Sequence, residues 1–378
     1  RLDGVAFTGS TGTARLIARS LAARDAPLAA LIAETGGQNA MIVDSSALPE
    51  QVVADALSSA FDSAGQRCSA LRILCLQDDV APEMLSMLEG AMRELAIGDP
   101  RHLSTDIGPV IDAEARAGLN AHVERMRAAG LKVVEMPLPP ACARGTFVAP
   151  TLVDLGNIRG LAHLTREVFG PVLHVLRWKR DELPALIDAI NATGYGLTHG
   201  IHTRIDETVA AILARVRAGN IYVNRNFRAG VVGVQPFGGH GLSGTGPKAG
   251  GPLYLRRLVR GMSTPAPEAA IALPGPTGEA NTLEFHPRGV VACIAADENG
   301  LFAQAKAALA AGNTVLLLRD PLSVRVGKGI GGARITFVDE LDPAAIDTVL
   351  LDVDRNDARR VRGVFAAAPG RIVPIVIP

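Results

Sequence analysis

One cysteine stands where a helix-like segment gives way to a strand-like one. Residues 49–64 are typical of a helix and residues 71–76 (LRILCL) are typical of a strand. Between them lies Gly65-Gln66-Arg67-Cys68-Ser69. A side chain at such a junction can face a cleft, and a thiol becomes a nucleophile where its surroundings favour the thiolate. The junction therefore predicts an α/β chain with Cys68 as a candidate catalytic residue.

A glutamate stands upstream of this cysteine, in the segment Glu34-Thr-Gly-Gly-Gln-Asn39. The glycine pair bends the chain sharply, which leaves the carboxylate of Glu34 at a turn. A cysteine taken alone is most often a buried residue without chemical function. The two motifs in this order, however, resemble the aldehyde dehydrogenase superfamily. The resemblance implies that Cys68 is the nucleophile and that Glu34 is the general base.

The composition argues against several classes of function. The chain of 378 residues has 38 basic and 38 acidic side chains, so no basic excess is available to bind nucleic acid. The four cysteines show no C-x-x-C spacing, which indicates neither a disulfide framework nor a zinc site. His199 and His202 lie in a strand-like segment without an evident third ligand, so we expect no metal site.

Both ends of the sequence look like cuts in a longer chain. The chain begins at Arg1 without a methionine, and it ends at Pro378 inside an apolar run. No signal peptide is visible, and no apolar run approaches the roughly 18 residues that span a bilayer. We therefore expect a cytoplasmic fragment, from a full-length protein that is either cytoplasmic or held peripherally at the inner membrane.

The first candidate for cofactor binding is a turn between a strand and a helix. Residues 5–7 are strand-like, residues 8–13 (TGSTGT) form a turn, and residues 14–23 have helical spacing. Such a turn aims free backbone N–H groups at a phosphate, although many helices simply begin with Ser or Thr as an N-cap. In aldehyde dehydrogenases this turn meets the cofactor pyrophosphate. The resemblance thus implies that Gly9 and Ser10 bind NAD.

The second candidate is Arg166-Glu-Val-Phe-Gly-Pro-Val172. Taken alone, a carboxylate before an aromatic residue and a Gly-Pro bend can be an ordinary turn. The segment resembles the E-x-F-G-P element of the superfamily. This resemblance implies that Glu167 hydrogen-bonds a ribose of NAD and that Phe169 packs beside the nicotinamide.

Residues 224–255 narrow the resemblance. They contain the segments NRNFRAGVVGVQPFGGHGLSGTG and PKAGGP, which resemble the L-glutamate γ-semialdehyde (1-pyrroline-5-carboxylate) dehydrogenase module of the proline utilisation A (PutA) family. The likeness covers residues 1 to 262. It implies that Ser69, Ala229 and Gly230 hold the substrate carboxylate and that Phe237 packs its aliphatic part. The family loop usually reads Gly then Ala, and here the order is reversed, which puts the anchor's local geometry in question.

The same resemblance implies partners. In that family the dehydrogenase follows an upstream proline dehydrogenase domain, so FAD is expected only where that domain is present. A homo-oligomer is expected as well. The organic substrate is L-glutamate γ-semialdehyde.

The pattern along the chain predicts an α/β fold. It resembles the aldehyde dehydrogenase three-layer fold, with part of a Rossmann-like NAD domain (1–33), a catalytic domain (34–262), a Pro-, Ala- and Gly-rich linker (263–281) and a truncated C-terminal degenerate Rossmann-like domain (282–378). Helices are expected at 14–23, 49–64, 82–95, 112–130, 184–193, 208–217 and 301–311. Strands are expected at 5–7, 28–33, 39–44, 71–76, 148–153, 219–224, 288–294, 312–318, 335–338, 348–351 and 371–377.

The C-terminal domain resembles a copy of the cofactor half with its ligand groups replaced. Asp297-Glu298-Asn299 puts acids where the family has an oxyanion donor, and Arg319 followed by the acid Asp320 stands where the family has a lysine. Gly327-Lys-Gly-Ile-Gly-Gly332 matches G-x-G-x-x-G but leads into a strand, so we do not interpret it as a dinucleotide fingerprint. We expect this domain to bind no NAD and to dock on the dehydrogenase module.

The implied reaction is NAD-dependent oxidation of L-glutamate γ-semialdehyde to L-glutamate through a thiohemiacetal and a thioester on Cys68. The Cys68 backbone N–H would stabilise the oxyanion together with an asparagine that this chain lacks. One alternative is a dehydrogenase for another aldehyde, and a second is a non-catalytic scaffold. A third is a circular permutation in which 282–378 replaces a missing cofactor half, and the acids at 297–299 and 319–320 argue against it.

Overall fold

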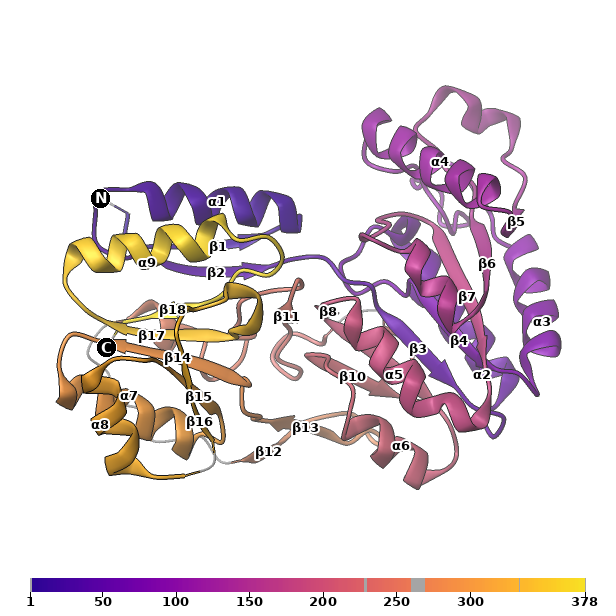
Figure 1. The fold of residues 1–378 in the computed structure, drawn as a ribbon. Helices are drawn as coiled ribbons and strands as arrows, with labels where there is room; N and C mark the ends of the chain where they lie inside the picture. Colours follow the sequence, from indigo (N-terminus) through magenta and orange to yellow (C-terminus); the bar gives the residue numbers. More distant parts are fainter. Residues whose placement is uncertain (1, 228–229, 260–268, 333, 378) are drawn as a thin grey trace. The chain divides into compact units, whose positions relative to one another are not determined.

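The structure is a computed structural model that describes residues 2–227, 230–259, 269–332 and 334–377. Two compact units make up the chain, and they are described separately (Figure 1). The terminal unit comprises Arg1–Thr35, Val231–Phe237 and Gly244–Pro378. The central unit comprises Gly36–Gly230 and Gly238–Ser243. The domain boundaries expected from the sequence remain a proposal.

A seven-stranded sheet of order β10-β9-β3-β4-β7-β6-β5 forms the middle of the central unit. Its strands are β3 (Ala40–Val43), β4 (Ile73–Gln77), β5 (Lys132–Glu135), β6 (Thr151–Asn157), β7 (Val172–Trp178), β9 (Thr198–His202) and β10 (Asn220–Val223). Neighbouring strands are parallel except for the β5–β6 pair. Strands β3, β4 and β9 are buried along their whole length, as parallel strands covered on both faces are.

Five helices contribute to the single apolar core of this unit. They are α2 (Pro49–Phe61), α3 (Ala81–Arg93), α4 (Ala113–Ala128), α5 (Leu183–Ala192) and α6 (Asp206–Leu213). All five lie where the sequence predicts a helix, because their apolar positions recur at helical spacing. A short antiparallel pair, β8 (Tyr195–Gly196) with β11 (His240–Gly241), completes the unit. None of the helices in the described part of the chain is long and apolar enough to cross a membrane.

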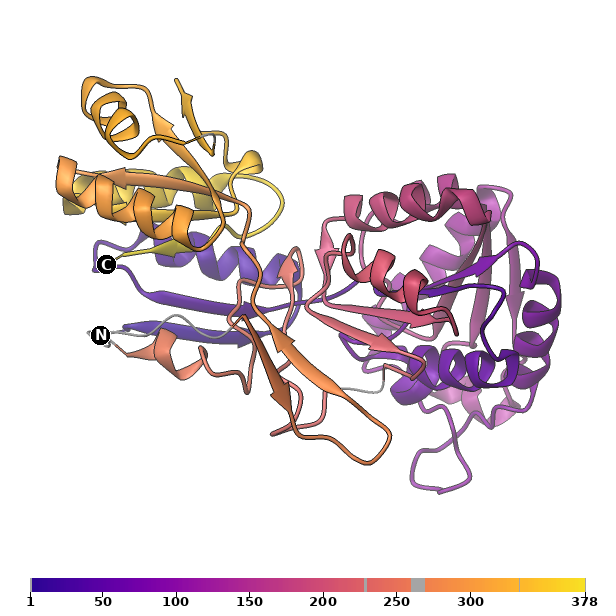
Figure 2. The same ribbon diagram turned by 90° about the horizontal axis from the view of Figure 1, so that it is seen from below.

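The terminal unit begins with a strand, a helix and a parallel strand, namely β1 (Gly4–Thr8), α1 (Thr11–Ala23) and β2 (Ala30–Glu34). It also contains an antiparallel hairpin of β12 (Ala270–Leu273) and β13 (Asn281–Glu284), which Figure 2 shows side by side. Strand β12 lies within the segment that the sequence suggests as a linker. The proline- and glycine-rich stretch therefore includes regular structure between its turns.

The rest of this unit is a parallel five-stranded sheet of order β16-β15-β14-β17-β18. The strands are β14 (Val290–Ala295), β15 (Thr314–Leu318), β16 (Ile335–Val338), β17 (Thr348–Asp352) and β18 (Ile375–Val376). In order of appearance this is 3-2-1-4-5, the order of a doubly wound dinucleotide-binding sheet. Helices α7 (Glu298–Ala310) and α8 (Pro321–Ile330) share one apolar cluster with the sheet, and α9 (Arg355–Ala367) shares another. The doubly wound fold predicted from the sequence is thus confirmed, and Gly327 lies inside α8 ahead of a strand.

The helices of this sheet carry acids at their N-termini. Asp297 accepts the N–H of Gly300 at 2.8 Å, and Asp320 accepts that of Ser323 at 2.8 Å. Asp354 accepts from two N–H groups at the start of α9. A phosphate at any of these ends would compete with a carboxylate for the same donors and meet its negative charge. These caps support the expectation that the C-terminal sheet binds no dinucleotide.

Helix α9 lies against α1 within the terminal unit (Figure 1). Arginines within each helix donate hydrogen bonds to backbone carbonyls at the C-terminal end of the other helix. Arg15 and Arg19 of α1 donate to the carbonyls of Ala368 and Ala366 at 3.3 and 3.2 Å. Arg362 of α9, which is 6% exposed, donates to carbonyls around the end of α1, those of Ala22, Arg24 and Ala26. Cations are favourable at helix C-termini, so the helices pack antiparallel and each caps the other.

This reciprocal capping leads to the first testable prediction. Arg362→Met keeps an apolar stem but removes the donors to the last carbonyls of α1, and we expect it to weaken that end of the helix by about 1–2 kcal/mol. Hydrogen exchange of the α1 amides should accelerate. Arg360→Met is a matched control, because Arg360 lies exposed on the same helix and, within the part of the chain that the structure describes, pairs with its neighbour Asp357. Unchanged exchange in the Arg362 variant would contradict the capping role.

Candidate active site

The loop that carries Cys68 has a strained entry. Helix α2 ends at Phe61, and the following 3-10 turn holds Ser63, Ala64 and Gly65 at φ values of 57°, 53° and 64°. Left-handed backbone costs a non-glycine residue about 1–3 kcal/mol, so surrounding contacts must hold this turn in place. At Gly65 a Cβ atom would also overlap the carbonyl of Gly170. Glycine is therefore required there by both the backbone angle and the close approach.

Cys68 differs from the other three cysteines in its exposure. Cys68 is half-buried, whereas Cys75, Cys142 and Cys293 are buried. Burial raises the pKa of all three buried thiols, that of Cys293 to about 12. A buried thiol that stays protonated is a poor nucleophile. Cys68 is thus the thiol that combines access with the junction position predicted from the sequence.

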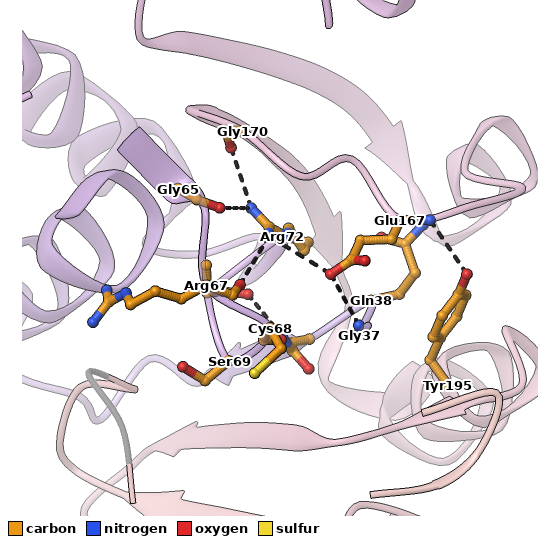
Figure 3. A network of polar contacts seen from close by, with 12 residues as sticks. Gly37, Gln38, Gly65, Arg67, Cys68, Ser69, Arg72, Glu167, Gly170 and Tyr195 are labelled. Carbon is orange, nitrogen blue, oxygen red and sulfur yellow. Dashed lines mark hydrogen bonds and ion pairs between the residues drawn. The ribbon is translucent and has the colours of Figure 1, made fainter. Parts of the chain in front are cut away.

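A buried guanidinium, that of Arg72, holds the cysteine loop (Figure 3). Its Nη1 donates to the carbonyls of Gly65 at 2.7 Å and Gly170 at 3.1 Å, and its Nη2 donates to Arg67 at 3.0 Å. The side chain is fully buried, and its Nη2 lies 3.7 Å from Oε1 of Glu167. Arg72 therefore ties the loop before Cys68 to the segment of Glu167 and Phe169. The sequence analysis did not identify Arg72. A charged residue inside the apolar run 71–76 nevertheless indicates a side chain that needs buried partners.

The charge on Arg72 acts on the thiol as well as on the carboxylate. Burial lowers the pKa of Arg72 to about 10, while the negative charges of Glu167 and Cys68 oppose that shift. At neutral pH the guanidinium still carries its proton. A cation near a thiol favours the thiolate, which is the reactive form. The site thus contains an electrostatic source for activating Cys68.

Glu167 is held from several directions. Burial raises the pKa of its carboxyl group, against the opposing effects of Arg72 and of the Gly37 N–H, which donates to Oε1 at 3.1 Å. The backbone N–H of Glu167 donates to the Tyr195 hydroxyl at 3.4 Å. A Cβ on Gly36 would overlap the Glu167 carboxylate. Gly36 therefore makes room for Glu167, a reason that the sequence alone did not show.

Phe169, two residues after Glu167, packs near Arg72 but is open to solvent. Its side chain is 43% exposed, and its ring centroid lies 5.4 Å from the Arg72 guanidinium carbon. An exposed aromatic ring beside a held carboxylate offers a flat face to a planar ring and an acceptor to a hydroxyl. Both features fit the predicted contacts of Glu167 and Phe169 with a nicotinamide riboside.

Asn39 fixes the other side of the cysteine loop. Its Nδ2 donates to the carbonyls of Cys68 at 2.7 Å and Ala70 at 2.8 Å. Its Oδ1 accepts the N–H of Thr198 at 3.1 Å, and the Thr198 hydroxyl donates to the Ser69 carbonyl at 3.2 Å. Ser69, predicted to hold a substrate carboxylate, is 3% exposed. Figure 3 shows Cys68 and Ser69 together on one side of Arg72.

The predicted phosphate turn lies in the terminal unit. Ser10 caps α1 by accepting the N–H of Thr13 at 3.1 Å, and the first turn of α1 carries no acidic residue. The Gly9 N–H donates to the Glu34 carbonyl at 3.1 Å, and a Cβ on Gly9 would overlap the Phe7 ring. A serine-capped N-terminus without an acid fits a pyrophosphate, in contrast to the aspartate-capped α7, α8 and α9.

The remaining predicted residues belong to both units. Glu34 ends β2 in the terminal unit and forms a β-bridge with Gly244. Phe237, in the same unit, exchanges backbone hydrogen bonds with Ala249 at 2.9 and 2.8 Å. Gly230 is half-buried in the central unit, and Ala229 lies outside the described residues. The structure brings Cys68, Ser69, Glu167 and Phe169 together in the central unit, and Gly9, Ser10 and Glu34 together in the terminal unit.

Comparison with known proteins assigns the chain to a family. Residues 1–264 match the model of the aldehyde dehydrogenase family. The bifunctional protein PutA of Escherichia coli strain K12 is 46% identical over 444 aligned residues, which cover 99% of this chain and 33% of the relative. The chain therefore spans about a third of that protein.

Solved structures agree with the match. A proline utilization A structure from Bradyrhizobium japonicum is 57% identical with a TM-score of 0.64, covering 67% of this chain and 26% of that one. A Thermus 1-pyrroline-5-carboxylate dehydrogenase with bound NAD is 32% identical with a TM-score of 0.61, covering 67% of this chain and 49% of that one. Because the family model covers more than half of its length and the solved relatives share its fold, the chain belongs to the aldehyde dehydrogenase family.

Proposed function

We propose that this chain carries the catalytic part of an NAD-dependent L-glutamate γ-semialdehyde dehydrogenase. The observation that carries the proposal is the half-buried Cys68, held in a strained loop over the buried cation of Arg72. The relatives named PutA and 1-pyrroline-5-carboxylate dehydrogenase support this substrate over other aldehydes. The segment from Asn224 to Leu255, which resembles that branch, supports the same choice.

Cys68 begins the proposed reaction. Its thiolate adds to the aldehyde carbon, a C–S bond forms, and the carbonyl oxygen becomes an oxyanion that the Cys68 backbone N–H would stabilise. When bound, NAD⁺ supplies the acceptor for the hydride that leaves this carbon. The product of this first half is a thioester on Cys68.

Glu34 serves the second half of the reaction. Its carboxylate takes a proton from the water that attacks the thioester, and the C–S bond then breaks to release L-glutamate and the thiolate. The residues proposed to hold NAD are Gly9 and Ser10 at the α1 N-terminus and Glu167 and Phe169 beside Arg72. Ser69, Ala229, Gly230 and Phe237 are proposed to hold the substrate.

The whole protein extends beyond this chain in our proposal. We infer an upstream proline dehydrogenase domain that binds FAD, a homo-oligomeric assembly and a cytoplasmic location. The name bifunctional protein PutA and the one-third coverage of that relative support the upstream domain. The division into residues 1–33, 34–262, 263–281 and 282–378 belongs to the same proposal.

Replacing the nucleophile is the direct test. In the full-length protein, Cys68→Ala should abolish NADH formation from L-glutamate γ-semialdehyde, because no other accessible thiol of this chain takes its place. NAD⁺ binding, measured by calorimetry, should be nearly unchanged. Cys142→Ala is the matched control, since Cys142 is a buried thiol on a separate 3-10 turn. Substantial turnover in the Cys68 variant would exclude it as the nucleophile.

Replacing the base separates the two halves of the reaction. Glu34→Gln keeps the size of the side chain but cannot take a proton from water. We expect the first-turnover burst of NADH to persist while the steady-state rate falls by roughly 100-fold or more, the usual contribution of a general base. Stopped-flow absorbance resolves the two phases. A steady-state rate equal to that of the unmodified protein would rule Glu34 out as the base.

Arg72 is tested through the reactivity of the thiol. Arg72→Met removes the cation that favours the thiolate, so the pH midpoint for alkylation of Cys68 by iodoacetamide should move upward by about one pH unit or more. The double variant Arg72→Met, Glu167→Gln removes the carboxylate left without its cation and guards against misfolding. Background labelling is measured in Cys68→Ala. An unchanged midpoint in both Arg72 variants would show that Arg72 only supports the loop.

A further inference from the structure

A lysine that the sequence analysis did not consider, Lys248, lies in the loop that follows Gly244, the β-bridge partner of the proposed base Glu34. The loop of residues 244–251 begins alongside the end of β2, where Gly244 forms an antiparallel bridge with Glu34. Thr245 fastens this return, because its N–H donates to the Ala33 carbonyl at 2.9 Å and its hydroxyl accepts the Ala33 N–H at 2.9 Å. Lys248 follows within the same loop.

The far end of the loop is fastened as well. Ala249, next to Lys248, exchanges two backbone hydrogen bonds with Phe237, and the Gly251 N–H donates to the Lys248 carbonyl at 3.1 Å. The backbone of Lys248 is thus held on both sides by residues of its own unit. A side chain on so constrained a segment loses less freedom when it takes up a fixed position.

The surroundings of Lys248 are unusual for a lysine. Burial lowers the pKa of its ammonium group to about 8, and the charge of Glu34 opposes that shift. Lysine is rarely buried unless it is paired, because removing its charge from water costs free energy. A nearby carboxylate offsets part of this cost. The cation in turn favours the ionised form of that carboxylate.

Another charged side chain, that of Arg288, contacts this loop. Arg288 donates from Nη2 to the Thr245 carbonyl at 3.1 Å, so it contacts the loop backbone. The charges that act on Arg288 are those of Arg257 and Asp347, and burial lowers its pKa. The charge of Glu34 acts on Lys248. Both residues of this pair belong to the terminal unit, Glu34 at the end of β2 and Lys248 in the 244–251 loop.

We propose that Lys248 is a positioning residue that keeps Glu34 ionised and aimed for thioester hydrolysis, and so sets the lower pH limit of that step. The proposal rests on the function proposed above, in which Glu34 takes a proton from water. A base acts only in its deprotonated form, so a cation that favours the carboxylate extends activity toward acidic pH. Lys248 touches no reacting atom in this role and acts through Glu34.

The competing explanation is that Lys248 only packs the loop. The two explanations differ in what neutralising the side chain does. Loss of packing would lower every step at every pH, including acylation of Cys68. Loss of the cation would leave acylation intact and move only the acidic limb of hydrolysis. A measurement that separates acylation from hydrolysis across pH therefore decides between them.

The test uses p-nitrophenyl acetate with the full-length protein, so that it needs neither NAD nor the proposed natural substrate. Acylation of Cys68 releases p-nitrophenolate in a burst, and hydrolysis of the acyl-enzyme sets the steady state. In Lys248→Met we expect an unchanged burst and an acidic limb of the steady-state profile raised by about one pH unit. Lys248→Arg should keep the limb where the unmodified protein has it. Lys306→Met is the control, because Lys306 lies exposed on α7.

Several outcomes would overturn the proposal. These are a Lys248→Met profile that superimposes on that of the unmodified protein, a burst lost together with the steady state, or an arginine variant that behaves like the methionine variant. Absence of any burst in the unmodified protein would remove the thiol chemistry on which the proposal depends. Failure of the substrate assignment looks different, since L-glutamate γ-semialdehyde would then give no NADH while the ester profiles still separated.

Discussion

The geometry of the central unit's site depends on one buried cation. The guanidinium of Arg72 donates to two carbonyls of the loop before Cys68, those of Gly65 and Arg67, and to the carbonyl of Gly170 after Glu167, so neither segment can move without breaking hydrogen bonds in a dry environment. Burying it is costly, and the pair with Glu167 does not fully offset that cost, because burial lowers the pKa of Arg72 and raises that of Glu167. Such a pair is better explained by what it positions than by stability.

The terminal unit contains the parallel pair β1–β2 with its helix α1 and a five-stranded doubly wound sheet, and the helices of the two differ in the chemistry of their N-termini. Helix α1 begins with Ser10 and has no acid in its first turn, whereas α7, α8 and α9 begin with aspartates whose carboxylates already accept the free N–H groups. A parallel sheet with helices therefore does not make a dinucleotide site by itself. Because Ser10 also accepts an N–H of its helix, the difference lies in the charge of the cap: an aspartate repels a phosphate at the same helix end, and a serine does not.

Local sequence patterns predicted much of the fold. The part of the site that the sequence did not predict depends on contacts between residues far apart in the chain. The helices of the central unit and the position of Cys68 follow from spacing within a dozen residues. Arg72 meets Gly170, which is 98 residues away, and Asn39 meets Thr198 across 159 residues. No local pattern encodes such pairings. The strand Val172–Trp178 was not predicted either, since a short apolar run after the E-x-F-G-P element carries no alternation to separate strand from loop.

The same distinction explains the glycine pair at 36 and 37. A bend that exposes Glu34 was a sufficient explanation from the sequence, but the structure adds that Gly36 leaves space for a carboxylate from residue 167. One small residue thus serves two requirements, of which only the first is local. Substituting it would displace Glu167 from Arg72 even if the bend survived. A glycine can be required by the backbone conformation or by the close approach of another residue. Only a structure can establish the second requirement.

In our proposals each reactive group has its own cation within its own unit. Arg72 acts on Cys68 in the central unit, and Lys248 acts on Glu34 in the terminal unit. Electrostatic tuning of this kind depends on distances of a few ångströms and on exclusion of water, both of which are set by packing inside a unit. The nucleophile and the base would then be prepared independently of each other. Catalysis would divide accordingly, with thiol activation and thioester hydrolysis open to separate perturbation.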